Sequence, residues 1–552
     1  MDNIKFILKY LIKFKTLIVA IILLSLLSSG INLIMPYITK QVFDYGIVPG
    51  EITTIVNFCL LLIGLYFFKF IISYYSNILH TKSSVLFTMS IKKDLYSHLL
   101  RLPMSYFDKN KKGYILSRID ETDSLSILFS SAIIDFFASL ITAIGALIFI
   151  LNKSWILGVV SLVFLPLFYF LSRISLKRIH SSSKELYEVT ATTKGKLQES
   201  IEGIQELKQL NNEQSTFEDL TKRINKITKE TINRGKFAAI GTQGVSFLMN
   251  FSQILIILII GILIVKKKLS IGDYMALTQY VLMLYAPVQL LSTFSMTIQP
   301  SIVALQRIVG IFKLDTEVNR SGHNINNIET IEFKNISFNY DGSKDQTLKN
   351  INFTLKKGDK VAFEGINGSG KSTIVKLLLG LYTNYEGEIN INGININKIN
   401  IKTLRDRIGI VSQNIILFSG TLMDNIKMAN PEITNAKLEE LLKIFNDKIF
   451  DDIDPYSTTI GEKGNNLSGG QKQKIAVLRA IAKDPDVLIF DEATSNMDIS
   501  SQSLLKDAIN SIFKSKTCIL ISHEKHISNL ADIILKVEDG VIEDQLKEPI
   551  SQ

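Results

Sequence analysis

The chain has 552 residues, of which 47% are hydrophobic and 20% are charged, and its formal net charge is +9 at pH 7. This length allows several domains, and the apolar content excludes a chain that is soluble throughout and predicts a membrane portion. The positive charge is attributed to cytoplasmic loops that face anionic lipid, so no nucleic-acid partner is expected.

Six apolar runs in the first 300 residues predict membrane-spanning helices, because each approaches or exceeds the roughly 20 residues that cross a bilayer. Their predicted bounds are 16–38, 54–79, 128–151, 155–175, 240–265 and 274–300. The polar gaps 80–125 and 176–237 contain little Gly or Pro, which predicts helices that continue into water. Residues 1–314 are therefore predicted to form an all-α six-helix transmembrane domain with cytoplasmic extensions.

Basic residues predict the orientation of these spans. Four lysines precede the first span, and both polar gaps are rich in Lys and Arg, so the positive-inside rule places all three segments in the cytoplasm. The triplet Lys266 to Lys268 is an exception to this pattern. A multi-pass protein of the cell membrane is expected, and the abundance of Lys, Asn and Ile favours a bacterial plasma membrane.

Residues 315–552 have the pattern of an α/β domain. The strand-like VAFEG runs directly into GINGSGKST, Gly365 to Thr373, and a predicted helix, Ser372 to Leu381, follows. This strand, loop and helix order surrounds a complete Walker A pattern. Three glycines let the backbone amides converge on phosphates, Lys371 reaches the β- and γ-phosphates, and the Ser372 hydroxyl can ligate Mg²⁺.

A second run, VLIFDEATS, predicts an apolar strand that ends in two carboxylates. Adjacent side chains of a strand point in different directions, so one carboxylate can face a metal while the other faces water. Asp491 is the expected Mg²⁺ residue, and Glu492 is the candidate general base that orients the attacking water.

The stretch NNLSGGQKQK, Asn465 to Lys474, predicts a second anion site. Ser468, Gly469 and Gly470 precede or open a predicted helix whose free backbone amides point outward. One nucleotide needs only one phosphate cradle, so a second cradle in the same chain requires an explanation.

Together these motifs resemble the ATP-binding cassette transporters, and within them half-transporters of the exporter type. LSGGQ, Leu467 to Gln471, is similar to the family signature, and PMSYFDKNKKGYILSRI, Pro103 to Ile119, is similar to the first cytoplasmic extension of exporters. Gln413 matches the glutamine loop, SNMD ending at Asp498 the D-loop, and His523 the switch histidine. The D-loop departs from the family pattern at Asn496 and Met497.

The resemblance implies roles for a defined set of residues. The catalytic residues would be Glu492, His523 and Gln413, and the Mg²⁺ residues would be Ser372, Gln413 and Asp491. The nucleotide would be held by Tyr340, which stacks on adenine, and by Gly365, Asn367, Gly368, Ser369, Gly370, Lys371, Ser372, Thr373, Leu467, Ser468, Gly469, Gly470, Gln471 and Asp498.

The resemblance also implies a dimer. In this family two nucleotide-binding domains meet head to tail, so the Walker A loop of one and the signature of the other enclose the same ATP. The chain is therefore expected to pair with a second copy of itself or with a related half-transporter. The turns near Thr122 to Ser126 and Asn211 to Phe217 are expected to contact the Gln413 region and to couple the two domains.

The expected function is ATP-driven export of a hydrophobic or amphipathic substrate, such as a lipid, drug or small peptide, by alternating access. A nucleotide-gated channel or a lipid flippase built on the same architecture is the alternative. Polar residues in or near the spans are candidates to line a substrate cavity or to pair between helices. They are Asn32, Lys69, Asp135, Asn250, Gln253, Gln279 and Gln289.

Overall fold

The computed structural model describes residues 2–110, 112–317, 322–343, 345–443, 457–492, 515–522, 528 and 531–546. The chain divides into two compact units. The first comprises Met1–Leu100 and Asn110–Leu314, and the second comprises Arg101–Lys109 and Asp315–Gln552.

The first unit is helical throughout its described secondary structure. Its elements are α1 (Asp2–Lys13), α2 (Lys15–Gln41), a π-helix (Val42–Ile47), α3 (Ile52–Leu99), α5 (Lys112–Ser124), the 3₁₀ helix η2 (Leu125–Phe129), α6 (Ser131–Lys153), α7 (Trp155–Glu202), α8 (Ile204–Gln209), α9 (Glu213–Val265) and α10 (Ile271–Phe312). Within the described residues, six helical stretches are long and apolar enough to cross a membrane, which confirms the predicted helical class. Helices α3, α7 and α9 have 48, 48 and 53 residues, so they extend well beyond the roughly 20 residues of a bilayer crossing.

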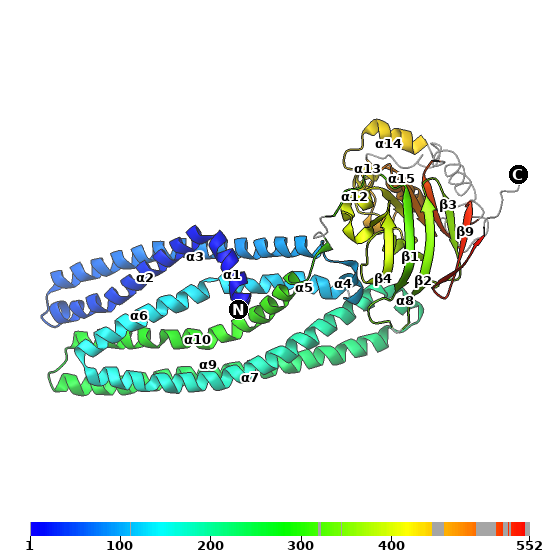
Figure 1. Cartoon of the computed structure of the whole chain (residues 1–552). Helices are drawn as coiled ribbons and strands as arrows, with labels where there is room; N and C mark the ends of the chain where they lie inside the picture. Colours follow the sequence, from blue (N-terminus) through cyan, green and yellow to red (C-terminus); the bar gives the residue numbers. More distant parts are fainter. Residues whose placement is uncertain are drawn as a thin grey trace. The chain divides into compact units, whose positions relative to one another are not determined.

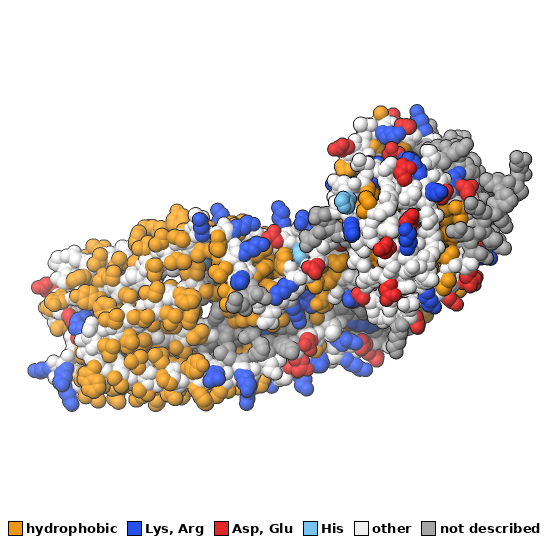
Figure 2. Space-filling model, viewed as in Figure 1, with side chains coloured by type: hydrophobic (Ala, Val, Ile, Leu, Met, Phe, Trp, Pro, Cys, Tyr) orange, Lys and Arg blue, Asp and Glu red, His pale blue; other side chains and the backbone are white. Residues whose placement is uncertain are grey.

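Three helix pairs organise this unit: α7 with α9, α6 with α10, and α2 with α3 (Figure 1). The aromatic rings of Phe168 and Tyr285 meet edge to face in its buried core, with ring centroids 5.0 Å apart. Large apolar side chains also cover much of the outer surface (Figure 2), and in α3 the side chains of Ile63, Phe67 and Phe70 are about two-thirds exposed. Such an apolar exterior is unfavourable in water and suits contact with lipid.

A polar cluster joins α2, the π-helix, α6 and α10 at one end of these helices. The carboxylate of Asp44 accepts hydrogen bonds from the Ser270 hydroxyl (2.8 Å) and the Gly272 amide (3.0 Å). Lys40 forms a 2.8 Å ion pair with Asp273, which also caps α10 by a reciprocal interaction with Ser270. The cluster therefore fixes the start of α10 to the end of α2.

The second unit contains two sheets (Figure 1). A four-stranded antiparallel sheet has the order β2-β1-β4-β5, and a six-stranded sheet has the order β10-β9-β3-β8-β7-β6, parallel except at β10. The strands are β1 (Thr330–Phe338), β2 (Leu348–Lys356), β3 (Lys360–Glu364), β4 (Tyr385–Ile391), β5 (Ile394–Asn395), β6 (Ile408–Val411), β7 (Val487–Asp491), β8 (Thr517–Ser522), β9 (Ile533–Glu538) and β10 (Val541–Leu546).

The α-helices in the described part of the second unit are α4 (Met104–Lys109), α11 (Lys371–Leu378), α12 (Ile401–Asp406), α13 (Leu422–Lys427), α14 (Asn435–Leu442) and α15 (Gly469–Ile481). The inner strands β3, β7 and β8 are almost fully apolar and buried, as expected for parallel strands covered on both faces. Loops that follow parallel strands meet at one edge of the sheet, where ligands bind in such folds. The loops after β3, β6 and β7 therefore define the candidate site.

One turn that the sequence assigns to coupling has partners inside the helical unit. The turn at Thr122–Ser126 lies inside the helical unit, where Thr122 and Leu125 are fully buried and η2 packs against α3, α6 and α10. The segment of the membrane half that groups with the second unit is Arg101–Lys109, which contains α4.

We predict that Asp44→Ala lowers the free energy of unfolding by about 1–3 kcal/mol, because it leaves a buried amide and a hydroxyl without their acceptor. Thermal unfolding of the full chain in lipid nanodiscs measures this. Glu51→Ala is the matched control, since the Glu51 carboxylate accepts a local hydrogen bond from the Thr54 hydroxyl, three residues along. Equal melting temperatures for the two variants would contradict a stabilising role for the cluster.

Candidate functional site

The loop between β3 and α11 forms the centre of the site. A Cβ at Gly365 would lie 2.2 Å from the carbonyl oxygen of Val537 in β9, so only glycine allows this close approach of the two strands. Gly370, with φ +108°, caps α11 in the left-handed conformation that glycine adopts readily. The backbone is thereby bent so that the amides at the start of α11 face the loop.

The loop fits a phosphate ligand on two observations. The Ser369 hydroxyl is buried and has no hydrogen-bond partner among the described residues. At Gly368, with φ +87°, a Cβ would meet no atom within 4 Å, so the loop borders open space there. Asn367 lies in the same turn, and Ser372 and Thr373 lie in the first turn of α11. A nucleotide phosphate would supply the partner that Ser369 lacks.

Lys371 is folded against its own loop. Its ammonium group donates to the carbonyl oxygens of Gly365 and Ile366, each at 2.8 Å, and the residue is 5% exposed. Burial lowers the pKa of Lys371 below its ordinary value, and the nearby carboxylates of Glu492 and Asp491 oppose that shift. The lysine is therefore held at the loop without an ion-pair partner among the described residues.

The two predicted carboxylates diverge at the end of β7. The Ser372 hydroxyl lies 3.0 Å from the Asp491 carboxylate and donates to it. The next residue, Glu492, has φ +50°, its amide donates to Ile521 in β8 at 2.9 Å, and its carboxylate accepts a hydrogen bond from the Gln413 amide group. The left-handed conformation of Glu492 turns its side chain towards the loop after β6. Gln413 thus contacts Glu492, whereas the serine and aspartate form the candidate metal pair.

The environment of Asp491 differs from that of an exposed carboxylate. Burial raises its pKa above the ordinary value, and the hydrogen bond from Ser372 partly opposes that shift. Hydroxyl and carboxylate oxygens are the ligands that Mg²⁺ prefers, so this pair fits the metal that the sequence implies.

Tyr340, the predicted adenine-stacking residue, follows β1 and belongs to an aromatic cluster. Its hydroxyl lies 3.1 Å from the Thr373 hydroxyl in α11, and its ring meets that of Tyr382 edge to face at 5.3 Å. The Tyr382 hydroxyl donates to Asp108 in α4. Burial and this hydrogen bond raise the pKa of Tyr382, so its hydroxyl stays protonated and continues to donate.

Sequence reasoning identified Asp108 as part of an exporter-like pattern but missed Tyr382. No motif marks Tyr382, which lies in the connection between α11 and β4. A second contact, the 2.8 Å ion pair of Lys109 with Asp341, joins α4 to the residue beside Tyr340. The aromatic cluster that contains Tyr340 is therefore linked to α4 through two adjacent residues of that helix.

The signature forms a capped helix start. The Ser468 hydroxyl accepts a hydrogen bond from the backbone amide of Gln471 at 3.2 Å. In return, the side-chain oxygen of Gln471 accepts one from the backbone amide of Ser468 at 2.9 Å. This capping box fixes the first turn of α15, which contains Gly469 and Gly470, and a Cβ at Gly470 would meet no atom within 4 Å. Leu467 packs against the neighbouring apolar core and anchors the turn. The second predicted anion site is thus an open helix N-terminus.

The structure brings together most of the predicted site residues at the loops after β3, β6 and β7. Asp498 and His523 lie outside the described residues, so their predicted roles stay predictions.

Two family models match the chain. Residues 18–288 match the model of the ABC transporter transmembrane region, and residues 348–495 match the ABC transporter model. The chain is 28% identical to the ATP-dependent lipid A-core flippase of Escherichia coli (strain K12) over 94% of this chain and 90% of that protein. It is 27% identical to the uncharacterized ABC transporter ATP-binding protein YfiC of Bacillus subtilis (strain 168) over 96% of this chain and 89% of that protein.

A solved structure shares the fold. A bacterial Atm1-family ABC exporter with ATP bound superposes with a TM-score of 0.87 at 21% identity, covering 96% of this chain and 95% of that one. Both the helical unit and the nucleotide-binding unit therefore have the fold of an ABC exporter.

We predict that Asp491→Asn leaves the unfolding free energy unchanged or raises it at neutral pH while weakening Mg²⁺-dependent nucleotide binding. The folded state holds the Asp491 proton more tightly than the unfolded chain does, because its pKa is raised. Its contribution to stability is therefore most favourable at acid pH and declines as pH rises through the folded-state pKa. Melting temperatures across pH, compared between wild type and variant, measure the difference.

Asp484→Asn is the control, because the pH dependence of stability expected for this carboxylate has the opposite sign. The hydrogen bond from Lys516 lowers the pKa of Asp484, so its contribution is present at neutral pH and is lost as pH falls through that pKa. Removing the Asp484 carboxylate is expected to lower the melting temperature slightly at neutral pH and to leave it unchanged at acid pH. A pH dependence of the same sign for both variants would contradict the assignment of Asp491.

Proposed function

The chain belongs to the ABC transporters, and from this membership and the geometry above we propose that it works as a homodimeric exporter of an amphipathic, lipid-like substrate. The observation that carries the proposal is that one chain joins six membrane-length helices to a domain that matches the ABC transporter family. Residues 1–314 would form the substrate path, and residues 315–552 would bind and hydrolyse ATP in the cytoplasm. The plasma membrane of a bacterium is the proposed location.

The dimer follows from the two anion sites. The loop after β3 and the N-terminus of α15 each offer backbone amides to phosphate, and each chain has one of each. We propose that Ser468, Gly469 and Gly470 of one subunit bind the γ-phosphate of an ATP held by the Walker A loop of the other. ATP would then join the two subunits, and its hydrolysis would release them.

The hydrolytic step uses residues that the structure brings together. Lys371, whose ammonium group donates to two loop carbonyls, would bind the β- and γ-phosphates, and Ser372 and Asp491 would hold Mg²⁺. When bound, Mg²⁺ neutralises the charge of the phosphates. Glu492 orients the attacking water, and Gln413, which donates to it, positions this carboxylate. Tyr340 would present its ring to adenine.

Transfer of a lipid between leaflets is a specific form of this proposal. It is supported by the relatives named ATP-dependent lipid A-core flippases, which the chain matches over nearly its whole length. The exposed apolar side chains of the helices would also let a lipid substrate reach the protein from the bilayer.

We predict that Glu492→Gln reduces ATP turnover at least about a hundredfold while ATP still binds, because the amide cannot act as a base and the phosphate-binding residues are unchanged. The measurement is ATP hydrolysis by the purified full chain in lipid nanodiscs, together with retention of bound nucleotide. Glu462→Gln, in the segment before the signature, is the matched control. Undiminished turnover in Glu492→Gln would contradict the assigned base, and an inert wild type that binds ATP would contradict the homodimer.

A further inference from the structure

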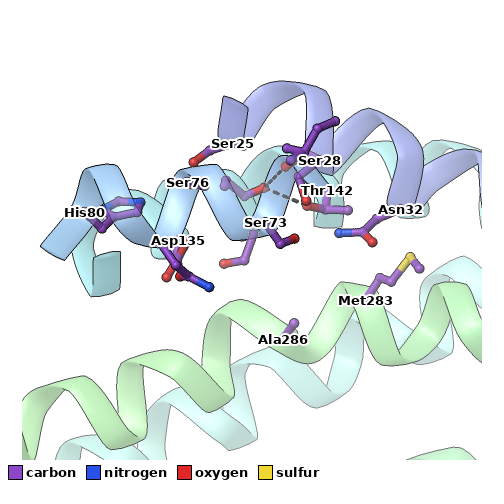
Figure 3. Close-up of a pocket in the computed structure, with 15 residues that line it drawn as sticks. Ser25, Ser28, Asn32, Ser73, Ser76, His80, Asp135, Thr142, Met283 and Ala286 are labelled. Atoms are coloured by element: carbon purple, nitrogen blue, oxygen red, sulfur yellow. Dashed lines mark hydrogen bonds between the residues drawn. The ribbon is translucent and has the colours of Figure 1, made fainter. Parts of the chain in front are cut away.

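A cavity of about 450 Å³ lies within the helical unit (Figure 3). It is bounded by α2, α3, α6 and α10, so each of its walls belongs to a membrane-length helix. Its described lining residues are Ser25, Ser28, Ser29, Asn32, Ile72, Ser73, Ser76, Asn77, His80, Asp135, Ala138, Ser139, Thr142, Met283 and Ala286.

The lining is polar, although it lies among apolar helices. Hydroxyl and amide side chains predominate, and some of the hydroxyls are already satisfied locally. Thr142 and Ser29 donate to the carbonyl oxygen of Ala138, and Ser139 donates to that of Phe136. Polar groups inside a membrane are costly unless they pair or face a ligand or water. The cavity therefore offers hydroxyl and amide groups to a ligand or to water.

His80 provides an independent observation. It is only 5% exposed, and neither of its ring nitrogens has a hydrogen-bond partner among the described residues. A buried imidazole that lacks both partners lowers the stability of the fold. Figure 3 shows the ring on the wall of the cavity beside Asp135. A ligand in the cavity would supply the partner that the protein does not.

Asp135 gives the cavity its charge. Its carboxylate is close enough to His80 to interact with it electrostatically, and it forms no ion pair within the described residues. No lysine or arginine is among the lining residues. The basic residues of α3 on either side, Lys69 and Lys82, do not line the cavity either. The described walls thus carry one carboxylate and no opposing fixed cation.

We propose that this cavity binds the polar part of the transported amphipathic molecule, and that this part is a cationic amine with N–H donors. The ammonium group binds the Asp135 carboxylate and donates to the unprotonated ring nitrogen of His80, while hydroxyls of the molecule bind the serine side chains. A phosphate in the same place would meet a carboxylate without a neutralising cation. The inference rests on the proposed export function and narrows its substrate class.

The test uses three probes that share a dodecyl chain and differ only in the head group: dodecylamine, dodecanol and dodecyl phosphate. Their binding to the full chain in phosphatidylcholine nanodiscs is measured by equilibrium dialysis without ATP, and their effect on ATP turnover is measured separately. We expect saturable binding and stimulation by dodecylamine, weaker effects of dodecanol, and none of dodecyl phosphate.

Two cavity variants and one control test the residues. Asp135→Asn is expected to weaken dodecylamine binding about tenfold or more, since a charge-assisted hydrogen bond is lost. His80→Leu is expected to weaken binding while leaving the melting temperature unchanged or higher, because it removes two unpaired polar atoms. Asp123→Asn removes a carboxylate that pairs with Lys92 outside the cavity lining, and it should bind like wild type.

Equal binding of dodecylamine and dodecyl phosphate would overturn the inference, as would unchanged affinity in Asp135→Asn. A lower melting temperature in His80→Leu would show that His80 stabilises the folded chain, which would contradict its proposed role in binding the amine. These failures are distinct from failure of the proposed function, in which the wild type would not hydrolyse ATP although it binds the amine.

Two further probes identify the source of the amine. One is a diacylglycerol esterified with lysine, which enters from the bilayer, and the other is a short apolar peptide with a free amino end and an amidated carboxyl end. Stimulation that depends on Asp135 supports the inference in either case and assigns the substrate to lipids or to peptides.

Discussion

The contact between Ser372 and Asp491 joins the two loops on which the ATPase site depends. Ser372 lies at the start of α11 after β3, and Asp491 ends β7, with β8 between the two strands. Because the strands are parallel, their carboxyl ends meet at one edge, and a hydroxyl and a carboxylate from distant parts of the sequence come together as the candidate metal pair. The same edge places Glu492, the proposed base, beside Gln413.

The candidate ATPase site and the cavity in the helical unit share one chemical feature. At the ATPase site, the loop presents a buried hydroxyl without a partner and a lysine bound only to backbone carbonyls. In the helical unit, the cavity presents a histidine that has no hydrogen-bond partner in the described part of the chain and that lies beside a carboxylate. The proposed ligands, phosphate at the first site and an amine at the second, would supply these missing partners. Buried polar groups without partners reduce the stability of the fold and are retained where they serve binding.

The sequence located the residues of the candidate site more fully than the contacts that surround them. Gly365 to Thr373, Asp491 and Glu492 were identifiable because phosphate and Mg²⁺ binding need particular residues at fixed spacing. Tyr382 could not be found, because its role comes from a tertiary contact with Asp108 that leaves no local pattern. For a related reason the sequence does not reveal that Thr122 and Leu125 are buried, because their burial comes from packing against helices that are distant in sequence. Among the polar span residues, Asn32 and Asp135 line the cavity, whereas Lys69 and Gln279 do not.

The central claim is that one ATP is enclosed by two chains, and mixed dimers test it most directly. A Lys371→Ala chain and a Ser468→Ala chain, carrying different tags, are coexpressed, and dimers containing both are purified. If Walker A and signature act across the interface, the mixed dimer has one site with both parts intact, so its ATP hydrolysis exceeds that of either variant homodimer. If the two parts act within one chain, every site in the mixed dimer is damaged. Turnover no higher than that of the homodimers would then contradict the account.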